Sequence, residues 1–346
     1  PALGPQMYEK VEAFDDATAD VSPDFRAQAA AVSIKSSEEK NLVSAGFITD
    51  AAGFNSIASS KGLLGYHKST RATYSCTART KDGTGSGWVG RGYNKVSQLD
   101  AGSFYKIAAD KAIRSANPRA LDPGVYEVVL EPSATSDILS SFTFSLDARN
   151  ADEGRSFFAK KGGGNKIGEK LFDEKVTIYS DPTDAEVPGT PYIGGGLPQK
   201  RITWVENGVL KNLSYSRFWA QKQGKEPIPF PSNILIRGGD ATLDELIKSV
   251  KRGVLVSTLW YIRSLDPQTM LLTGLTRDGN FYIENGEIKY PVKNFRWNES
   301  PAFVLANIAG MTKPMRVMGK ESGSANVSAP AMLAKEFHFS SVSDAV

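Results

Sequence analysis

The stretch Leu255-Val-Ser-Thr-Leu-Trp-Tyr-Ile-Arg-Ser-Leu-Asp-Pro-Gln-Thr269 decides the fold of the last third of this chain. Aliphatic, hydroxyl-bearing and aromatic residues dominate positions 253–261, a composition that predicts a strand. Three further strand-like runs follow at residues 270–275, 281–283 and 288–292. Together these runs predict a β-rich region.

Turn signals divide this region and the segment before it. Glu284-Asn-Gly-Glu287 and Glu206-Asn-Gly208 are typical of tight hairpin turns, because Asn and Gly adopt positive φ with little strain. Thr276-Arg-Asp-Gly279 is expected to form another turn. A helix is predicted over residues 300–309, with Gly310 ending it, and Thr242 is expected to cap a helix that runs to Lys251.

The first third combines helices with an antiparallel sheet. Residues 25–40 and 100–116 carry helix signals, with Pro23 in the first turn of the former and Asn117-Pro118 ending the latter. Between the helices, alternating runs predict a meander of short strands. These runs are residues 42–49, 54–59, 63–70, 72–80 and 86–93, with turns expected at Ala52-Gly53, Lys61-Gly62 and 82–85.

The segment Leu121-Asp-Pro-Gly-Val-Tyr-Glu-Val-Val-Leu-Glu-Pro132 is the best internal boundary, because it joins a turn, a buried strand and a helix start. A helix is predicted over residues 133–146. The predicted fold class is therefore α+β. A domain of helices and antiparallel sheet spans residues 1–122, and a larger β-rich, barrel-like domain spans residues 123–346.

The composition is that of an ordinary globular protein and gives little support for a charged partner. The 346 residues are 40% hydrophobic and 23% charged, with 41 basic and 38 acidic residues spread along the chain. Because no block of like charge is present, we expect no nucleic-acid partner and no membrane-surface partner. No apolar run reaches the roughly 18 residues that a membrane span requires.

The sequence contains few candidate residues for the common catalytic mechanisms. The two histidines, His67 and His338, are far apart in sequence, and Cys76 is the one cysteine. A catalytic zinc site usually takes three protein ligands, and no His-Glu-x-x-His or Cys-x-x-Cys run is present. The sequence also lacks a Gly-x-Ser-x-Gly elbow. The glycine runs 162–164 and 194–196 do not match a phosphate-binding loop and are expected to be mobile loops.

Several segments together resemble the TldD/PmbA family. The strongest continues from Leu255 through Thr276-Arg-Asp-Gly279 and Glu284-Asn-Gly-Glu287 to Asn298-Glu-Ser300, and a second match is Pro123 to Pro132. The resemblance covers residues 5–345. It lacks the family's first domain and the chain opens with Pro1, so we expect a piece of a longer protein.

TldD-like members of this family carry His-Glu-x-x-x-His on the helix after the second match, and a Cys near the C-terminus. Laying that pattern on this chain places Glu131 and Ser136 where the two His ligands would stand, and Pro132 where the catalytic Glu would stand. Met318 falls where the Cys would stand. The resemblance therefore implies a degenerate site, with no catalytic residue, no metal and no cofactor in this chain.

What the resemblance implies instead is a partner role. TldE-like proteins pair with a TldD-like subunit that supplies zinc, and the pair encloses a chamber for extended or unfolded peptides. Candidates that shape this chamber share polar side chains in the strongest match. They are Arg277, Asp278, Arg296, Asn298 and Glu299. Their alternative roles are structural, with Asp278-Gly279 as a turn and Asn298 or Ser300 as a helix cap.

Three hypotheses follow. The first is a non-catalytic, TldE-like subunit of a two-component zinc metallopeptidase that processes or degrades unfolded peptides. The second is a homo-oligomeric peptide-binding or scaffold protein without peptidase activity, and the third is an enzyme that uses the fold for another reaction. A single cysteine excludes an intrachain disulfide and is compatible with the cytoplasm, where we expect the protein.

Overall fold

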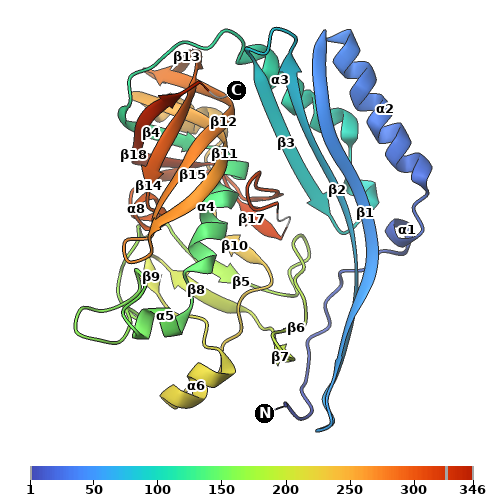
Figure 1. The fold of residues 1–346 in the computed structure, drawn as a ribbon, viewed down its shortest axis with the longest axis vertical. Helices are drawn as coiled ribbons and strands as arrows, with labels where there is room; N and C mark the ends of the chain where they lie inside the picture. Colours follow the sequence, from blue (N-terminus) through green and yellow to red (C-terminus); the bar gives the residue numbers. More distant parts are fainter. Residues whose placement is uncertain (1, 324–325, 345–346) are drawn as a thin grey trace.

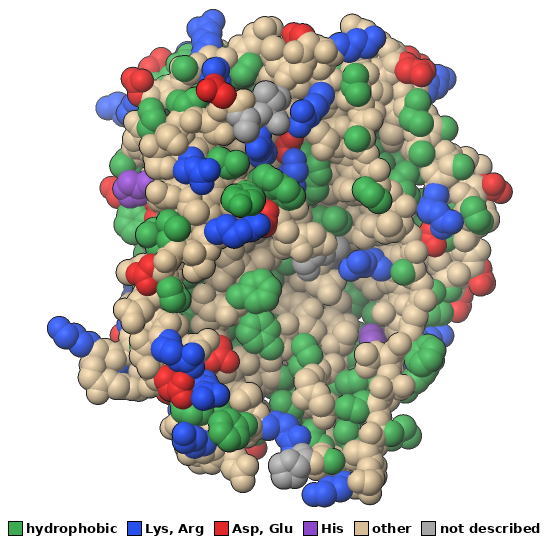
Figure 2. Space-filling view, viewed as in Figure 1, with side chains coloured by type: hydrophobic (Ala, Val, Ile, Leu, Met, Phe, Trp, Pro, Cys, Tyr) green, Lys and Arg blue, Asp and Glu red, His purple; other side chains and the backbone are tan. Residues whose placement is uncertain are grey.

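The computed structural model describes residues 2–323 and 326–344, and it confirms the predicted α+β class (Figure 1). A three-stranded sheet carrying two helices lies on one side of a larger, β-rich part. No helix in the described residues is both long and apolar enough to cross a membrane. Figure 2 shows basic and acidic side chains interspersed over the face viewed in Figure 1.

The first part is an antiparallel sheet in the order β1-β2-β3, with helices α2 and α3 on one face. Ser22 and Asp100 cap the two helices by accepting hydrogen bonds from Asp24 N and Ser103 N. Tyr74, Cys76 and Tyr105 lie in the core beneath them. The elements are α1 (Asp16–Ala19), α2 (Pro23–Glu39), β1 (Leu42–Ala58), β2 (Leu64–Thr80), β3 (Ser86–Tyr93), η1 (Val96–Gln98) and α3 (Ala101–Arg114).

The predicted antiparallel meander is confirmed, with its turns near Lys61-Gly62 and at residues 82–85, but the predicted short strands were wrong. β1 and β2 are each 17 residues long and pair without a break from Leu42↔Thr80 to Ala58↔Leu64. Gly53 lies inside this ladder opposite Ser69, so it does not form the expected turn. A glycine alone does not end a strand when both flanks continue to pair. The result is one long hairpin that extends beyond the helices (Figure 1).

The second part is built around a closed barrel. Strands β11, β4, β18, β14 and β12 pair in that order, and β12 pairs back with β11. These strands are β4 (Gly124–Leu130), β11 (Arg252–Asp266), β12 (Leu271–Glu284), β14 (Asn294–Glu299) and β18 (Met332–Ser343). β13 (Glu287–Val292) pairs with β12, and β15 (Ile308–Met311) pairs with β18.

A six-stranded sheet lies below the barrel in Figure 1, and α4 (Pro132–Phe144) contacts both. This sheet comprises β5 (Ile178–Ser180), β8 (Ile202–Glu206), β9 (Val209–Leu210), β10 (Ile234–Ile236), β16 (Met315–Val317) and β17 (Val327–Ala329). The remaining elements are α5 (Ala148–Asp152), α6 (Arg217–Gln223), α7 (Leu243–Ser249), α8 (Pro301–Ala306), β6 (Tyr192–Ile193) and β7 (Leu197–Pro198).

The predicted cap at Thr242 is confirmed, as a capping box with Glu245, although the helix ends at Ser249 and not at Lys251. Two further predictions near the barrel need correction. Thr276 to Gly279 is not a turn between strands: it lies inside β12, where a bulge opposite β11 places Asp278 at φ 59°. The helix expected over residues 300–309 ends at Ala306, because β15 begins two residues later and pairs with β18.

Strand β3 forms the seam between the two parts. It is buried on one face by α3, where a Cβ on Gly87 would lie 2.1 Å from the Ala108 carbonyl oxygen. On the other face Ser86 donates a hydrogen bond to the Asp278 carboxylate of β12, at 2.8 Å. The seam therefore holds the N-terminal sheet directly against the barrel, and the site described next lies along it.

Candidate functional site

The junction of β4 and α4 places Glu131 and Pro132, the first two predicted motif positions, at the seam. Glu131 is the N-cap residue of α4, and Pro132 follows in the first turn, where its missing N–H costs nothing. The backbone N–H of Glu131 donates to the Val256 carbonyl of β11, at 3.0 Å. The start of α4 is therefore fixed to the barrel wall.

The Glu131 side chain does not cap its own helix. Instead it forms an ion pair with Lys111 of α3, and both side chains are largely buried, with exposed fractions of 14% and 16%. A cavity of about 340 Å³ adjoins this pair and is lined by Trp88, Arg91 and Ser133 among others. Burial lowers the pKa of Arg91, and the charges of Tyr93 and Glu131 act in the opposite direction.

The other two motif positions lie close to the same helix turn. Ser136 is fully buried in α4, and its hydroxyl has no hydrogen-bond partner among the described residues. The carbonyl of Met318 accepts a hydrogen bond from Ser133 Oγ at 3.0 Å, which places Met318 beside the start of α4. The segment around Met318, which is far from α4 in sequence, therefore lies beside the first turn of that helix.

Asp137, which the sequence analysis did not single out, locks the segment that follows Met318. Its buried carboxylate accepts backbone hydrogen bonds from Lys320, Glu321 and Ser322, at 3.1, 3.4 and 3.0 Å. Gly319 fits only because it lacks a Cβ, which would lie 2.1 Å from Asp137 Oδ1. Burial raises the pKa of Asp137 to about 7, although the three N–H donors act in the opposite direction.

A second ion pair extends the site toward β12. Lys320 pairs with Asp278, whose carboxylate also accepts hydrogen bonds from Ser86 at 2.8 Å and Thr258 at 3.1 Å. The Lys320 ammonium lies 5.8 Å from the ring centroids of both Trp88 and Trp260. Because a buried carboxylate is costly unless it is paired, the lysine and the two hydroxyls together stabilise Asp278 at this position.

The side chains at the motif positions do not fit a zinc ion. Of the motif positions, Ser136 offers a hydroxyl, Met318 a thioether and Glu131 a carboxylate that an ammonium group already holds. A dication beside Glu131 would also be repelled by Lys111. No group of three His, Cys, Asp or Glu side chains that could hold a metal is found among the residues that the structure describes.

The five chamber candidates do not form one cluster. Asp278 lies in the seam, while Glu299 is buried in β14 and accepts hydrogen bonds from His338 N at 3.2 Å and from Ser300 N at 2.8 Å, with His338 Nδ1 2.7 Å away. The other three share the outer face of the barrel: Arg296 pairs with Leu275, Asn298 pairs with Thr273, and Arg277 follows on the same side of β12. Of the proposed structural roles, the Ser300 cap is present.

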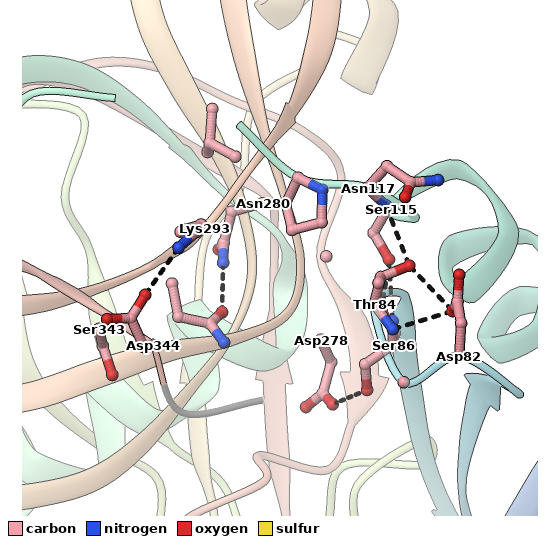
Figure 3. A pocket seen from close by; sticks show the side chains of 15 residues that line it. Asp82, Thr84, Ser86, Ser115, Asn117, Asp278, Asn280, Lys293, Ser343 and Asp344 are labelled. Carbon is pink, nitrogen blue, oxygen red and sulfur yellow. Dashed lines mark hydrogen bonds and ion pairs between the residues drawn. The ribbon is translucent and has the colours of Figure 1, made fainter. Parts of the chain in front are cut away.

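A polar cavity of about 500 Å³ lies on the other side of Asp278 (Figure 3). Ser86 and Ser115 enter it from the N-terminal part, and Asn280 and Lys293 enter it from the barrel. Figure 3 shows the Ser86–Asp278 bond and the Lys293–Asp344 pair in its walls. Its residues come from turns and strands distant in sequence, so no local signal could have predicted it.

Comparison with known proteins gives matches over nearly the whole chain. Residues 7–116 match the PmbA/TldA metallopeptidase central domain, and residues 123–341 match the PmbA/TldA metallopeptidase C-terminal domain. A metalloprotease of Methanothermobacter thermautotrophicus is 27% identical over 78% of this chain and 62% of its own length. The metalloprotease PmbA of Escherichia coli O157:H7 is 20% identical over 88% of this chain and 66% of its own length.

Solved structures show the same fold. TldE from Thermococcus kodakarensis superposes with a TM-score of 0.85 at 19% identity, covering 98% of this chain and 79% of that one. A Thermotoga maritima protein gives a TM-score of 0.85 at 20% identity, with 97% and 79% coverage. The chain spans 62%, 45% and 46% of the lengths of three curated relatives that it matches.

Proposed function

Because the chain belongs to the PmbA/TldD family of metallopeptidase-like proteins, we propose that it is a non-catalytic, TldE-like subunit. Its proposed partner is a TldD-like subunit that supplies zinc, and the proposed substrate of the pair is an extended or unfolded peptide. The observation that carries this proposal is the side-chain set at the start of α4, where Glu131, Pro132, Ser136 and Met318 replace the ligands and the base.

The Lys111–Glu131 pair supports the metal-free part of the proposal. A hydrolytic zinc ion needs nitrogen, thiolate or free carboxylate ligands, and it acts by lowering the pKa of a bound water to about 7. In this chain the carboxylate is neutralised by an ammonium group instead. A side-chain pair therefore provides the charge balance that a cation would otherwise provide, and no water is activated there.

The long hairpin supports the proposed assembly with a partner. β1 is an edge strand of 17 residues, and an unpaired edge of that length is a site at which proteins associate. Phe54 of β1 and Leu64 and Tyr66 of β2 lie on one face of the hairpin, and all three are more than 60% exposed. Exposed apolar side chains that gather in this way usually mark a protein contact.

The outer face of the barrel supports a peptide-binding role. Trp260 and Tyr261 are exposed on β11, close to Arg277, Arg296 and the other polar side chains of that face. An extended peptide can add as a strand to a sheet edge through main-chain hydrogen bonds, which place few demands on its sequence, and its side chains would then contact this outer face. We propose Arg277, Asp278, Arg296, Asn298 and Glu299 as residues that shape or support this surface.

The second candidate function is a homo-oligomeric peptide-binding or scaffold protein without peptidase activity. The same exposed residues of the hairpin favour it, because a surface that fits a homologous partner can also fit a second copy of this chain. For either function we propose the cytoplasm, where the buried, unpaired Cys76 would stay reduced.

The test is reconstitution with a TldD-like protein from the same source. The lone chain should contain no stoichiometric zinc and should not cleave an unstructured fluorogenic peptide. The co-purified pair should cleave it, and a chelator should abolish that activity. Chelator-sensitive cleavage by the lone chain would overturn the proposal, and a stable homo-oligomer that ignores the partner would favour the scaffold alternative.

A further inference from the structure

Two adjoining cavities lie between the long hairpin and the loops of the C-terminal part. Their volumes are about 570 and 320 Å³, and both are lined by His67 of β2 and Thr190. The hairpin β6–β7 reaches this place: Tyr192 donates a hydrogen bond to the Asn55 carbonyl at 2.6 Å, and Tyr8 donates one to the Gly196 carbonyl at 2.9 Å.

His67 has an unused hydrogen-bonding atom at the junction of the cavities. The residue is 8% exposed, and its Nε2 is buried without a hydrogen-bond partner among the described residues. Burial lowers the pKa of His67, so its imidazole is neutral at pH 7. A buried polar atom of this kind is costly unless a ligand or water satisfies it.

The smaller cavity is basic. Arg71 and Arg316 line it together with His67, and no Asp or Glu is found among the described residues of its wall. Arg316 is itself buried, and its guanidinium donates to Asn94 Oδ1 and to the Glu186 carbonyl, both at 2.8 Å. Burial lowers the pKa of Arg316 to about 10, while the charges of Tyr93, Glu186 and Asp184 raise it and that of Arg71 lowers it, so Arg316 is a cation at neutral pH.

The larger cavity has a different character. Ile57, Pro191 and Ile193 contribute apolar surface, and Gly194 to Gly196 form one wall. These three glycines have φ values of 55°, 80° and 94°, a left-handed run that other residues adopt only with strain. The glycine run forms the tight turn between β6 and β7, and this turn borders an apolar space beside a basic one.

We propose that the paired cavities bind the carboxylate end of a peptide. The terminal carboxylate would face Arg71 and Arg316 in the smaller cavity, and His67 Nε2 would contact the last peptide unit. The apolar side chain of the last residue would occupy the larger cavity. Two guanidinium groups suit this ligand because arginine binds carboxylates through paired, charge-assisted hydrogen bonds. The inference rests on the proposed function, because it assigns one end of the peptide that the subunit handles.

Calorimetric titration with N-acetyl-leucyl-leucine and its C-terminal amide tests the proposal, on the lone chain and on the reconstituted pair. The free acid should bind about tenfold more tightly than the amide, and more weakly at high salt. Arg71→Gln should remove most of this preference. Arg71 is exposed, so its replacement should leave the fold intact, whereas the buried Arg316 is unsuitable for substitution.

Arg237→Gln is the matched control, because Arg237 is exposed and lines neither cavity. It should retain the preference for the free acid, while His67→Gln should weaken both ligands. Equal binding of acid and amide, an unchanged preference in Arg71→Gln, or equally tight competition by inorganic phosphate would overturn the proposal. Any of these results leaves the subunit proposal intact, because that proposal is decided by zinc content and by cleavage in the reconstituted pair.

Discussion

Lys111 of α3 and Glu131 at the start of α4 form an ion pair across the seam between the N-terminal sheet and the barrel. The two residues are 20 positions apart in sequence, yet they belong to the two different parts of the fold. The pair therefore has two consequences: it joins the parts, and it occupies the one carboxylate that the degenerate motif retains.

Lys111→Met should destabilise the protein by about 2–4 kcal/mol, because it leaves the Glu131 carboxylate largely buried and unpaired. The double variant Lys111→Met with Glu131→Gln should recover much of the loss. Urea unfolding measures the free energy of unfolding of the single and the double variant. Lys35→Met is the control, since its pair with Glu39 is exposed and should contribute less than about 0.5 kcal/mol. Equal effects of the two lysine variants would contradict a structural role for the seam pair.

Gly90→Ala should destabilise the seam by about 1–3 kcal/mol. A Cβ at this position would lie 2.3 Å from the Trp88 ring and 3.1 Å from the Met318 Cβ, so Trp88 would have to move. The tryptophan fluorescence spectrum measures the movement of Trp88, and the thermal midpoint measures the loss of stability. Gly53→Ala is the matched control, because nothing lies within 4 Å of its Cβ and its backbone is extended. A neutral Gly90→Ala would show that the seam can repack.

Local patterns predicted the helices well and the long hairpin poorly. Ser22 and Asp100 stand where the structure has helix caps, since capping depends on residues within one turn. The length of β1 and β2 depends on pairing between strands, and Gly53 carried a turn signal that the continuous ladder overrides. Asp278 shows the same limit, because its Asp-Gly pair forms a bulge instead of a turn.

Only those residues of the site that belong to a continuous sequence motif could be predicted. Glu131, Pro132 and Met318 could be placed by resemblance to the family, and they lie near one another in the structure. Lys111, Asp137 and Lys320 could not, because each acts through a partner distant in sequence. No periodicity or spacing reports that a lysine of one helix will meet the first residue of another.

Asp137 should make stability depend on pH. Its pKa is about 7 in the folded protein and about 3.9 when unfolded, so the native state binds the proton more tightly. This contribution is fully present below pH 4 and is lost as the pH rises toward 7, by up to about 1.4 kcal/mol per pH unit. Asp137→Asn loses a hydrogen bond at every pH but cannot titrate. Its stability relative to the parent should therefore rise between pH 5 and 8 in urea unfolding, and a constant difference would contradict the raised pKa.

A chelator should leave the stability of the lone chain unchanged. A bound metal stabilises the folded state by mass action, and its removal lowers the thermal midpoint. Because Glu131 is held by Lys111 and the other motif positions are poor ligands, we expect a shift of less than about 1 °C with EDTA. Calorimetry checks this, with a TldD-like zinc subunit as the positive control. A clear decrease for the lone chain would reveal a metal that the donor set does not predict.

Phe54→Glu should prevent assembly without unfolding the chain. Phe54 is 70% exposed on β1 and stacks on Tyr66, with ring centroids 5.7 Å apart. Replacing an exposed side chain costs at most about 0.5 kcal/mol, but a charge buried in a protein contact costs much more. The variant should keep the parent's thermal midpoint and lose co-purification with a TldD-like partner. Phe218→Glu is the control, since Phe218 is 62% exposed on α6, away from the hairpin. If both variants assemble like the parent, the partner binds elsewhere.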